Sequence, residues 1–130
     1  MSDGVPDLSS FHFSDFAVVD DDPRIRASLK AEFDDLGLTS CFFDNAFDLI
    51  DYVSVNAVSG VFVDLLLPQL NGIECIKRLR LIGYEGPVFV FTGLCDSVIR
   101  QEALDAGAND YFVKSDLFAN LAKIVVSCSA

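Results

Sequence analysis

This sequence of 130 residues is poor in histidine, and its cysteines lie far apart from one another. Its single histidine is His12, and no two of its four cysteines form a C-x-x-C pair. Because zinc sites are usually built from closely spaced cysteines and histidines, this scarcity argues against a zinc site. The isolated cysteines indicate reduced thiols that behave as small apolar residues: Cys41, Cys75, Cys95 and Cys128.

Basic residues are also scarce. The chain has nine lysines and arginines and 20 acidic residues, which gives a formal net charge of −11. The chain therefore lacks the basic surface of a typical nucleic-acid-binding protein, and an anionic membrane would repel it. Carboxylates that cluster in such a chain would instead attract a divalent cation such as Mg²⁺ or Ca²⁺.

No apolar run reaches the roughly 20 residues of a membrane-spanning helix. The first residues contain acids and no basic segment, so they do not resemble a signal peptide, and we expect a cytoplasmic protein. Glycine, proline and serines in residues 1–14 predict a flexible leader. With 52% hydrophobic residues, the remaining segment, 15–130, is expected to form one domain.

Short apolar runs alternate with amphipathic segments along this domain. Apolar runs without polar alternation are typical of strands that are buried on both faces, and strict alternation with helices predicts an α/β fold with a parallel sheet between helical layers. The predicted strands are Phe16–Val19, Leu38–Phe43, Gly60–Asp64, Pro87–Phe91 and Tyr111–Val113. The predicted helices are Pro23–Leu36, Ala46–Val55, Ile73–Ile82, Ile99–Ala106 and Leu117–Cys128.

Several residues indicate where the helices begin and which side faces inward. Asp22 is a plausible N-cap before Pro23, which suits the first position of a helix. Asp116 is expected to cap the last helix in the same way. In the second helix we expect the inward face to carry Phe47, Ile50 and Val53.

Polar residues follow the predicted strands at the points where the strands end. Asp20 and Asp21 follow the first strand, Asp64 ends the third, Thr92 follows the fourth and Lys114 follows the fifth. The carboxyl ends of parallel strands form one rim, and ligands of open α/β sheets bind there. Each residue by itself could be a helix cap or an ordinary loop residue. Chance alone would rarely place all five at the same rim of the sheet.

These residue types suit phosphoryl transfer. Clustered carboxylates repel one another, and a bound Mg²⁺ relieves that repulsion while leaving coordination positions for phosphate oxygens. A carboxylate can also serve as the nucleophile that accepts a phosphoryl group. A lysine can neutralise charge on the transferred group, and a threonine hydroxyl can donate a hydrogen bond to it.

Four segments carry a resemblance to a known family. They are Val-Val-Asp-Asp-Asp-Pro at 18–23, the segment from Val-Asp to Asn-Gly at 63–72, Val-Phe-Thr-Gly at 90–93, and Gly-Ala-Asn-Asp-Tyr-Phe-Val-Lys at 107–114. The sequence resembles the receiver domains of two-component response regulators, including the single-domain chemotaxis type, over nearly all of the predicted domain. The resemblance implies a flavodoxin-like, doubly wound (βα)5 fold with a five-stranded parallel sheet in the order 2-1-3-4-5.

The resemblance also implies roles for individual residues. Asp64 matches the phosphoacceptor. Asp21 matches the acid that binds Mg²⁺ (or Mn²⁺) directly, and Asp20 matches the acid that acts through water. Leu66 would offer its backbone carbonyl to the metal, together with the Asp64 carboxylate.

The switch residues follow from the same resemblance. Thr92 matches the hydroxyl that moves toward the phosphoryl group, Tyr111 matches the aromatic residue that turns inward with it, and Lys114 matches the lysine that pairs with the acceptor. Ser115 departs from the family, because a proline usually follows this lysine, often after a cis peptide bond. A cis bond before serine would cost about 3 kcal/mol.

Positions beside the reaction centre are expected to control access to it. Leu66 and Leu94 lie two residues beyond the acceptor and the threonine, where the family tunes the approach of water. We hypothesise that these apolar side chains lengthen the lifetime of the phosphorylated state. Gly93 would leave room for a donor imidazole or a small phosphodonor.

The apolar residues of the last helix leave two interpretations of its outer face open. Phe118, Val125 and Val126 lie beyond the predicted inward stripe. They either widen the face that packs on the core or form a surface for a homodimer or another partner. In many receivers that surface is made by the fourth helix, the fifth strand and the fifth helix.

Three functions compete at this point. The first, which the residues favour, is a receiver that is phosphorylated by a sensor histidine kinase or a histidine phosphotransfer protein. The phosphorylated receiver would then control a partner or an output domain. It would catalyse only its own phosphorylation and dephosphorylation. The second is a pseudo-receiver that only binds proteins. The third is a flavodoxin-like cofactor binder, against which the acidic rim argues, because it would repel an anionic cofactor.

Overall fold

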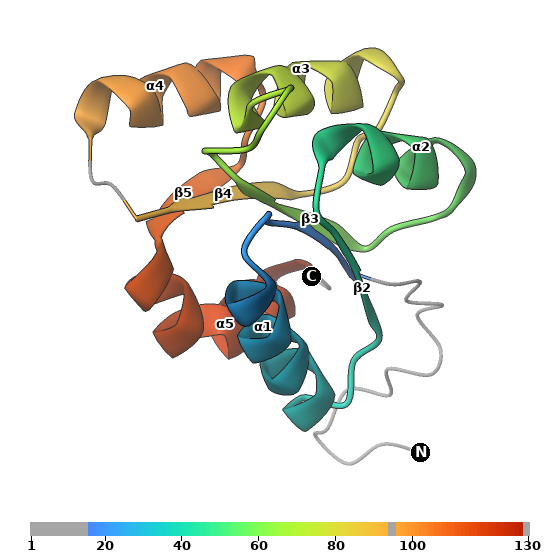
Figure 1. The fold of residues 1–130 in the computed structure, drawn as a ribbon, viewed down its shortest axis with the longest axis vertical. Coiled ribbons are helices and arrows are strands. Elements are labelled where there is room, and N and C mark those ends of the chain that lie inside the picture. The colour runs from blue at the N-terminus through green and yellow to red at the C-terminus, as the bar shows by residue number, and fades with distance from the viewer. Residues whose placement is uncertain (1–15, 94–95, 129–130) are drawn as a thin grey trace.

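The computed structural model describes residues 16–93 and 96–128, so the predicted leader and Leu94 lie outside the described residues. Five strands alternate with five helices along this part of the chain (Figure 1). The strands are β1 (Phe16–Val19), β2 (Ser40–Phe43), β3 (Gly60–Asp64), β4 (Val88–Thr92) and β5 (Asp110–Val113). The helices are α1 (Pro23–Asp35), α2 (Ala46–Val55), α3 (Gly72–Leu81), α4 (Ser97–Ala106) and α5 (Lys114–Cys128).

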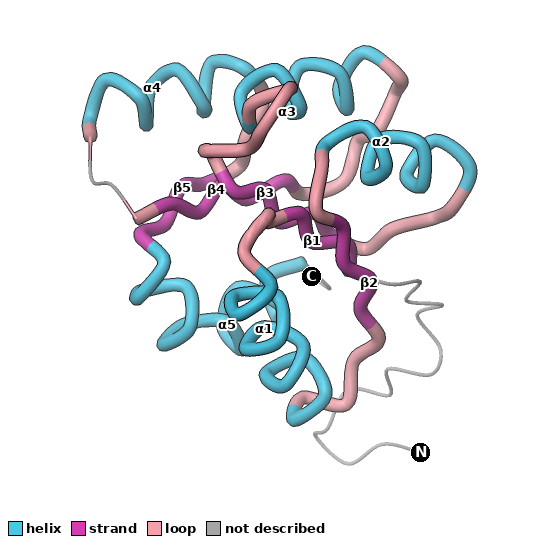
Figure 2. The backbone as a smooth tube through the Cα atoms, viewed as in Figure 1, coloured by secondary structure: helices cyan, strands magenta, loops and turns pink. Residues whose placement is uncertain are grey.

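The strands form one parallel sheet in the order β2-β1-β3-β4-β5, which confirms the predicted doubly wound topology. Figure 2 shows α1 and α5 on one side of the sheet and α2, α3 and α4 on the other. Each side has its own apolar core. The sheet is therefore the middle of three layers, and its polar strand ends lie outside both cores.

Aromatic side chains fill much of the core beneath α1 and α5. The Phe33 ring stacks on the Phe16 ring at 5.5 Å between centroids and meets the Phe62 ring edge-on at 5.8 Å. All three residues are at most 1% exposed. This packing fixes α1 against β1 and β3, the strands that carry the acidic residues.

The inward face of α2 differs from the prediction. The predicted Val53 is 7% exposed and Ile50 packs against the same core, but Phe47 is 42% exposed, and Ala46 and Leu49 are fully buried instead. The Phe47 ring instead lies under the guanidinium of Arg78, with 5.7 Å between the ring centroid and Cζ. The sequence suggested the wrong member of a run of apolar residues, because a cation on the neighbouring helix can cover an aromatic ring at the surface.

The last helix also begins earlier than predicted. It starts at Lys114, so Asp116 lies in its first turn and is not its N-cap. The peptide bond between Lys114 and Ser115 is trans, as are the other described peptide bonds. The strand thus passes directly into the helix, which fixes the direction in which the lysine side chain leaves the backbone.

The apolar residues on the outer side of α5 divide between the two interpretations. Val125 is 8% exposed and Phe118 is half-buried, and both pack on the core. Val126 is 66% exposed and faces solvent. None of the described helices is both long and apolar enough to cross a lipid bilayer.

Candidate functional site

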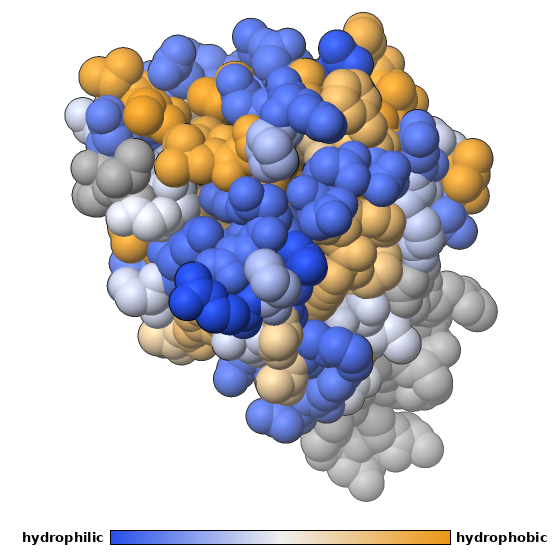
Figure 3. Space-filling view, viewed as in Figure 1, coloured by the Kyte–Doolittle hydropathy of each residue, from blue (hydrophilic) through white to orange (hydrophobic). Residues whose placement is uncertain are grey.

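The register of the sheet brings the acidic residues together. Val19 on β1 pairs with Val63 on β3, so the next residues, Asp20 and Asp64, leave adjacent strands at the same level. On β4, Thr92 pairs with Val113, the last residue of β5 before the lysine. Parallel strands end at a common rim, and hydrophilic side chains cover that area in Figure 3.

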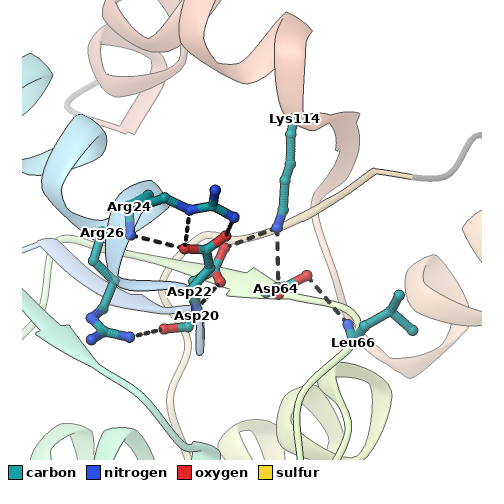
Figure 4. Close-up of polar contacts among 7 residues, drawn as sticks. All are labelled: Asp20, Asp22, Arg24, Arg26, Asp64, Leu66 and Lys114. Atoms are coloured by element: carbon teal, nitrogen blue, oxygen red, sulfur yellow. Dashed lines mark hydrogen bonds and ion pairs between the residues drawn. The ribbon is translucent and has the colours of Figure 1, made fainter.

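Lys114 joins the two buried carboxylates. Its Nζ lies 3.1 Å from Oδ2 of Asp20 and 3.6 Å from Oδ2 of Asp64 (Figure 4). The Asp20 side chain is fully buried and that of Asp64 is 4% exposed, whereas the Lys114 side chain retains 25% exposure. The predicted convergence of these residues is therefore present, with the ammonium between the two acids.

Backbone amides hold the other carboxylate oxygens. The Asp22 amide donates to Oδ1 of Asp20 at 2.8 Å, and the Leu66 amide donates to Oδ1 of Asp64 at 3.3 Å. Oδ2 of Asp20 is buried and, among the described residues, has no donor other than the Lys114 ammonium, whose Nζ lies 3.1 Å away. This acceptor oxygen of the site therefore depends on a single cation.

Burial and the charges of neighbouring groups shift the pKa values of Asp64 and Lys114. Burial raises the pKa of Asp64 to about 6, with a further contribution from the charge of Asp20, although the Lys114 ammonium opposes the shift. Burial lowers the pKa of Lys114, but the hydrogen bond to Asp20 and the charges of both acids outweigh it, so this pKa is raised. At neutral pH the lysine is thus a cation that two carboxylates share.

The acids can hold a divalent cation. Asp20, Asp21 and Asp64 offer carboxylate oxygens that lie within 4.8 Å of one another. Asp21 is exposed and the other two are buried, so the cluster opens toward solvent on one side. Three carboxylates beside one lysine leave an excess of negative charge, and no backbone amide of the described residues holds Oδ2 of Asp20. Both features fit Mg²⁺, which binds a few protein oxygens and keeps several waters.

The other residues that the resemblance singled out differ in burial. Thr92 is fully buried at the end of β4, and Tyr111 is 8% exposed and packs in the core between the sheet and α2, α3 and α4. Leu66 is 60% exposed, beside the acceptor. Gly93 is exposed, and an added Cβ would meet nothing within 4 Å. Leu94 lies outside the described residues.

Two contributions to the site were not predicted from the sequence. Nη1 of Arg26 donates to the backbone carbonyl of Asp20 at 2.7 Å. Gly72 packs against the acceptor strand, and a Cβ there would lie 2.6 Å from the carbonyl oxygen of Asp64. In the sequence, Gly72 stood out only as the last residue of a family motif. The one sequence feature that could have indicated Arg26 is its position in the first turns of the helix that follows the acids.

Comparisons with known proteins agree with this geometry. The model of the response regulator receiver domain family matches residues 16–126. The response regulator MprA of Mycobacterium sp. (strain KMS) is 33% identical over 97 residues, which cover 75% of this chain and 42% of that protein. The MprA protein of Mycolicibacterium vanbaalenii is 32% identical over the same shares of the two chains. The chain thus spans less than half the length of these relatives.

Solved structures share the fold. The receiver domain of the Francisella response regulator 1452 matches with a TM-score of 0.81 and 24% identity, over 88% of this chain and 94% of that one. The receiver domain of the sensor histidine kinase PA1611 from Pseudomonas aeruginosa matches with a TM-score of 0.82 and 21% identity, over 91% and 99%. That structure has a magnesium ion coordinated in its active-site cleft.

Proposed function

The chain belongs to the response regulator receiver domain family, and we propose that its Asp64 accepts a phosphoryl group in a magnesium-dependent reaction that switches the domain. The proposal depends chiefly on one observation. Asp64 is 4% exposed, yet its carboxylate lies beside a lysine and within 4.8 Å of two further carboxylates at the rim of the sheet. Burying an acid beside other acids costs folding free energy, and acids in such surroundings are concentrated at functional sites.

Asp20, Asp21 and Asp64 would hold the metal, together with the backbone carbonyl of Leu66. Mg²⁺, or Mn²⁺ in its place, would neutralise charge on the transferred group and the acids. Lys114 is already within 3.6 Å of the acceptor, so it can follow the charge from the carboxylate to the phosphoryl oxygens. These residues would orient the acceptor and exclude excess water.

The donor we propose is the phosphohistidine of a sensor histidine kinase or a histidine phosphotransfer protein. A carboxylate oxygen of Asp64 attacks the phosphorus, the phosphorus–nitrogen bond breaks, and its electron pair returns to the imidazole. The product is an acyl phosphate on Asp64 and a free histidine. Lys114 and the hydroxyl of Thr92 would then stabilise the new phosphoryl oxygens.

The output face we propose is made by α4, β5 and α5. A hollow of about 250 Å³ lies among these elements, and Tyr111 and Phe112 are part of its lining. Val98 on α4 and Val126 on α5 expose 68% and 66% of their surface. Movement of Thr92 and Tyr111 would alter this face, which would then control an output domain or a separate partner, or a homodimer.

The two other functions have less support. A pseudo-receiver would need no acceptor, whereas the described residues retain the three acids, the threonine and the lysine together. A flavodoxin-like cofactor binder would bring an anion to a rim that already carries uncompensated carboxylates. The acidic rim therefore favours a cation and phosphoryl transfer.

Intact-protein mass spectrometry tests the proposal. The protein is incubated with Mg²⁺ and a small phosphodonor, and the Asp64→Asn and Asp51→Asn variants are treated in parallel. We expect one added phosphoryl group on the wild type and on Asp51→Asn, which changes an exposed acid of α2, and none on Asp64→Asn. Absence of the added group from the wild type with every donor and kinase would favour the pseudo-receiver.

A further inference from the structure

Two neighbouring arginines of α1 make different contacts near the acids. Arg24 turns to Asp22, with Nε and Nη2 at 3.2 and 3.1 Å from its two carboxylate oxygens (Figure 4). Arg26 reaches back over six residues, and its Nη1 donates to the carbonyl of Asp20 at 2.7 Å. Of these two arginines, Arg26 is therefore the one whose side chain contacts the backbone of the candidate metal site.

The carbonyl of Asp20 belongs to the peptide unit that joins Asp20 to Asp21. A charged hydrogen bond to that carbonyl fixes the plane of the unit. The Asp20 carboxylate has a second restraint, the amide of Asp22 at 2.8 Å. The Asp21 carboxylate is exposed and makes no side-chain hydrogen bond within residues 16–93 and 96–128, so its direction depends on the backbone that Arg26 holds.

We propose that Arg26 is a positioning residue of the metal site. By fixing the Asp20–Asp21 peptide plane, it holds the exposed carboxylate of Asp21 toward Asp20 and Asp64, so that the three can bind one divalent cation. The proposal rests on the proposed function, because it assumes that the acids bind Mg²⁺. Partners behind the direct ligands commonly change metal affinity by about 10–100-fold.

Electrostatics alone predicts the opposite effect. The guanidinium is a positive charge next to the three acids, and it opposes the approach of a second cation. If Arg26 acted only through its charge, its removal would strengthen Mg²⁺ binding. If it acts by orienting the peptide unit, its removal weakens binding, so the direction of the change distinguishes the two roles.

Titration calorimetry with Mg²⁺ measures that direction on the whole chain. We expect Arg26→Met to weaken binding at least about tenfold, and Arg26→Lys, which keeps one charged donor, to weaken it less. Arg24→Met is the matched control, because it removes an equal charge two residues away that pairs with the Asp22 carboxylate. It should leave Mg²⁺ affinity unchanged or slightly higher.

Metal-free thermal melting and the phosphorylation assay separate the outcomes. If Arg26→Met is poorly folded without metal, the comparison rests on Arg26→Lys, whose affinity should fall below that of the wild type. Equal or tighter binding by the folded Arg26 variants would overturn the positioning role and leave the proposed function intact. If the wild type binds no Mg²⁺ and accepts no phosphoryl group, both proposals are wrong.

Discussion

Arg80, on α3, donates two hydrogen bonds to the carbonyl of Gly107, from Nε at 3.1 Å and from Nη2 at 2.8 Å. Its Nη1 donates to the carbonyls of Tyr84 and Gly86, both at 2.8 Å, and Nη2 also donates to Oδ1 of Asn109 at 3.0 Å. One guanidinium thus joins the loop before β4 to the turn that follows α4. Both segments precede strands, β4 and β5, so they lie at the amino ends of the sheet and the acidic rim lies at the carboxyl ends.

We expect Arg80→Met to destabilise the domain by about 2–3 kcal/mol, because three half-buried carbonyls lose a charged donor. Urea unfolding followed by circular dichroism measures the change. Arg78→Met is the control, since the Arg78 guanidinium lies over the exposed Phe47 ring, and it should cost less than about 1 kcal/mol. Equal losses in the two variants would contradict the special role of Arg80.

Gly72→Ala should destabilise the domain by about 1–3 kcal/mol, although alanine favours helices. An added Cβ would lie 2.6 Å from the carbonyl oxygen of Asp64 and 2.7 Å from Cα of Leu65, and both are backbone atoms. Thermal melting measures the loss. Gly93→Ala should have little effect on melting, because its Cβ would meet nothing within 4 Å, and a neutral Gly72→Ala would show that the acceptor strand can shift freely.

The metal-free protein should become less stable as the pH rises from about 4 to about 6. The Asp64 carboxyl, with its pKa raised by burial to about 6, stays protonated in the folded state over this range, whereas the unfolded chain has already released the proton. Stability from this group is therefore present below about pH 4 and lost as the pH passes through the folded pKa. The loss amounts to about 3 kcal/mol.

Asp64→Asn tests this dependence, because an amide does not titrate. In chelator-treated protein, we expect it to be more stable than the wild type at pH 7.5 by about 1–3 kcal/mol, and similar to it at pH 4. Denaturant unfolding at several pH values provides the measurement, with the exposed Asp51→Asn as the control. An unchanged pH slope in Asp64→Asn would mean that another group causes the dependence.

The apolar residues beside the acceptor should slow hydrolysis of the acyl phosphate. Leu66 exposes 60% of its surface next to Asp64, where it can exclude an attacking water, and Leu94 is predicted to act with it. We expect the Leu66→Asn, Leu94→Asn double variant to lose its phosphoryl group faster than the wild type in a decay assay. A half-life that is unchanged or longer would refute this idea.

The sequence predicted that the polar residues at the strand ends meet at one rim, because the evidence for strand ends is local. Apolar runs that end in Asp20, Asp64, Thr92 or Lys114 report strand ends, and parallel strands bring their ends together. The predictions failed where a neighbouring element decided the outcome. Phe47 lies at the surface with the Arg78 guanidinium over its ring, and Asp116 does not cap α5 because the helix starts at the lysine.

Periodicity and strand ends depend on residues near one another in the chain, so the alternation of strands and helices, the parallel topology and the residues at the rim could be inferred from the sequence. Which atoms meet could be seen only in the folded domain. The Lys114 ammonium lies between Asp20 and Asp64, Arg26 holds the Asp20 carbonyl, and Gly72 leaves space for the acceptor strand. These contacts join residues from different strands and helices, whose distances and burial no local pattern encodes.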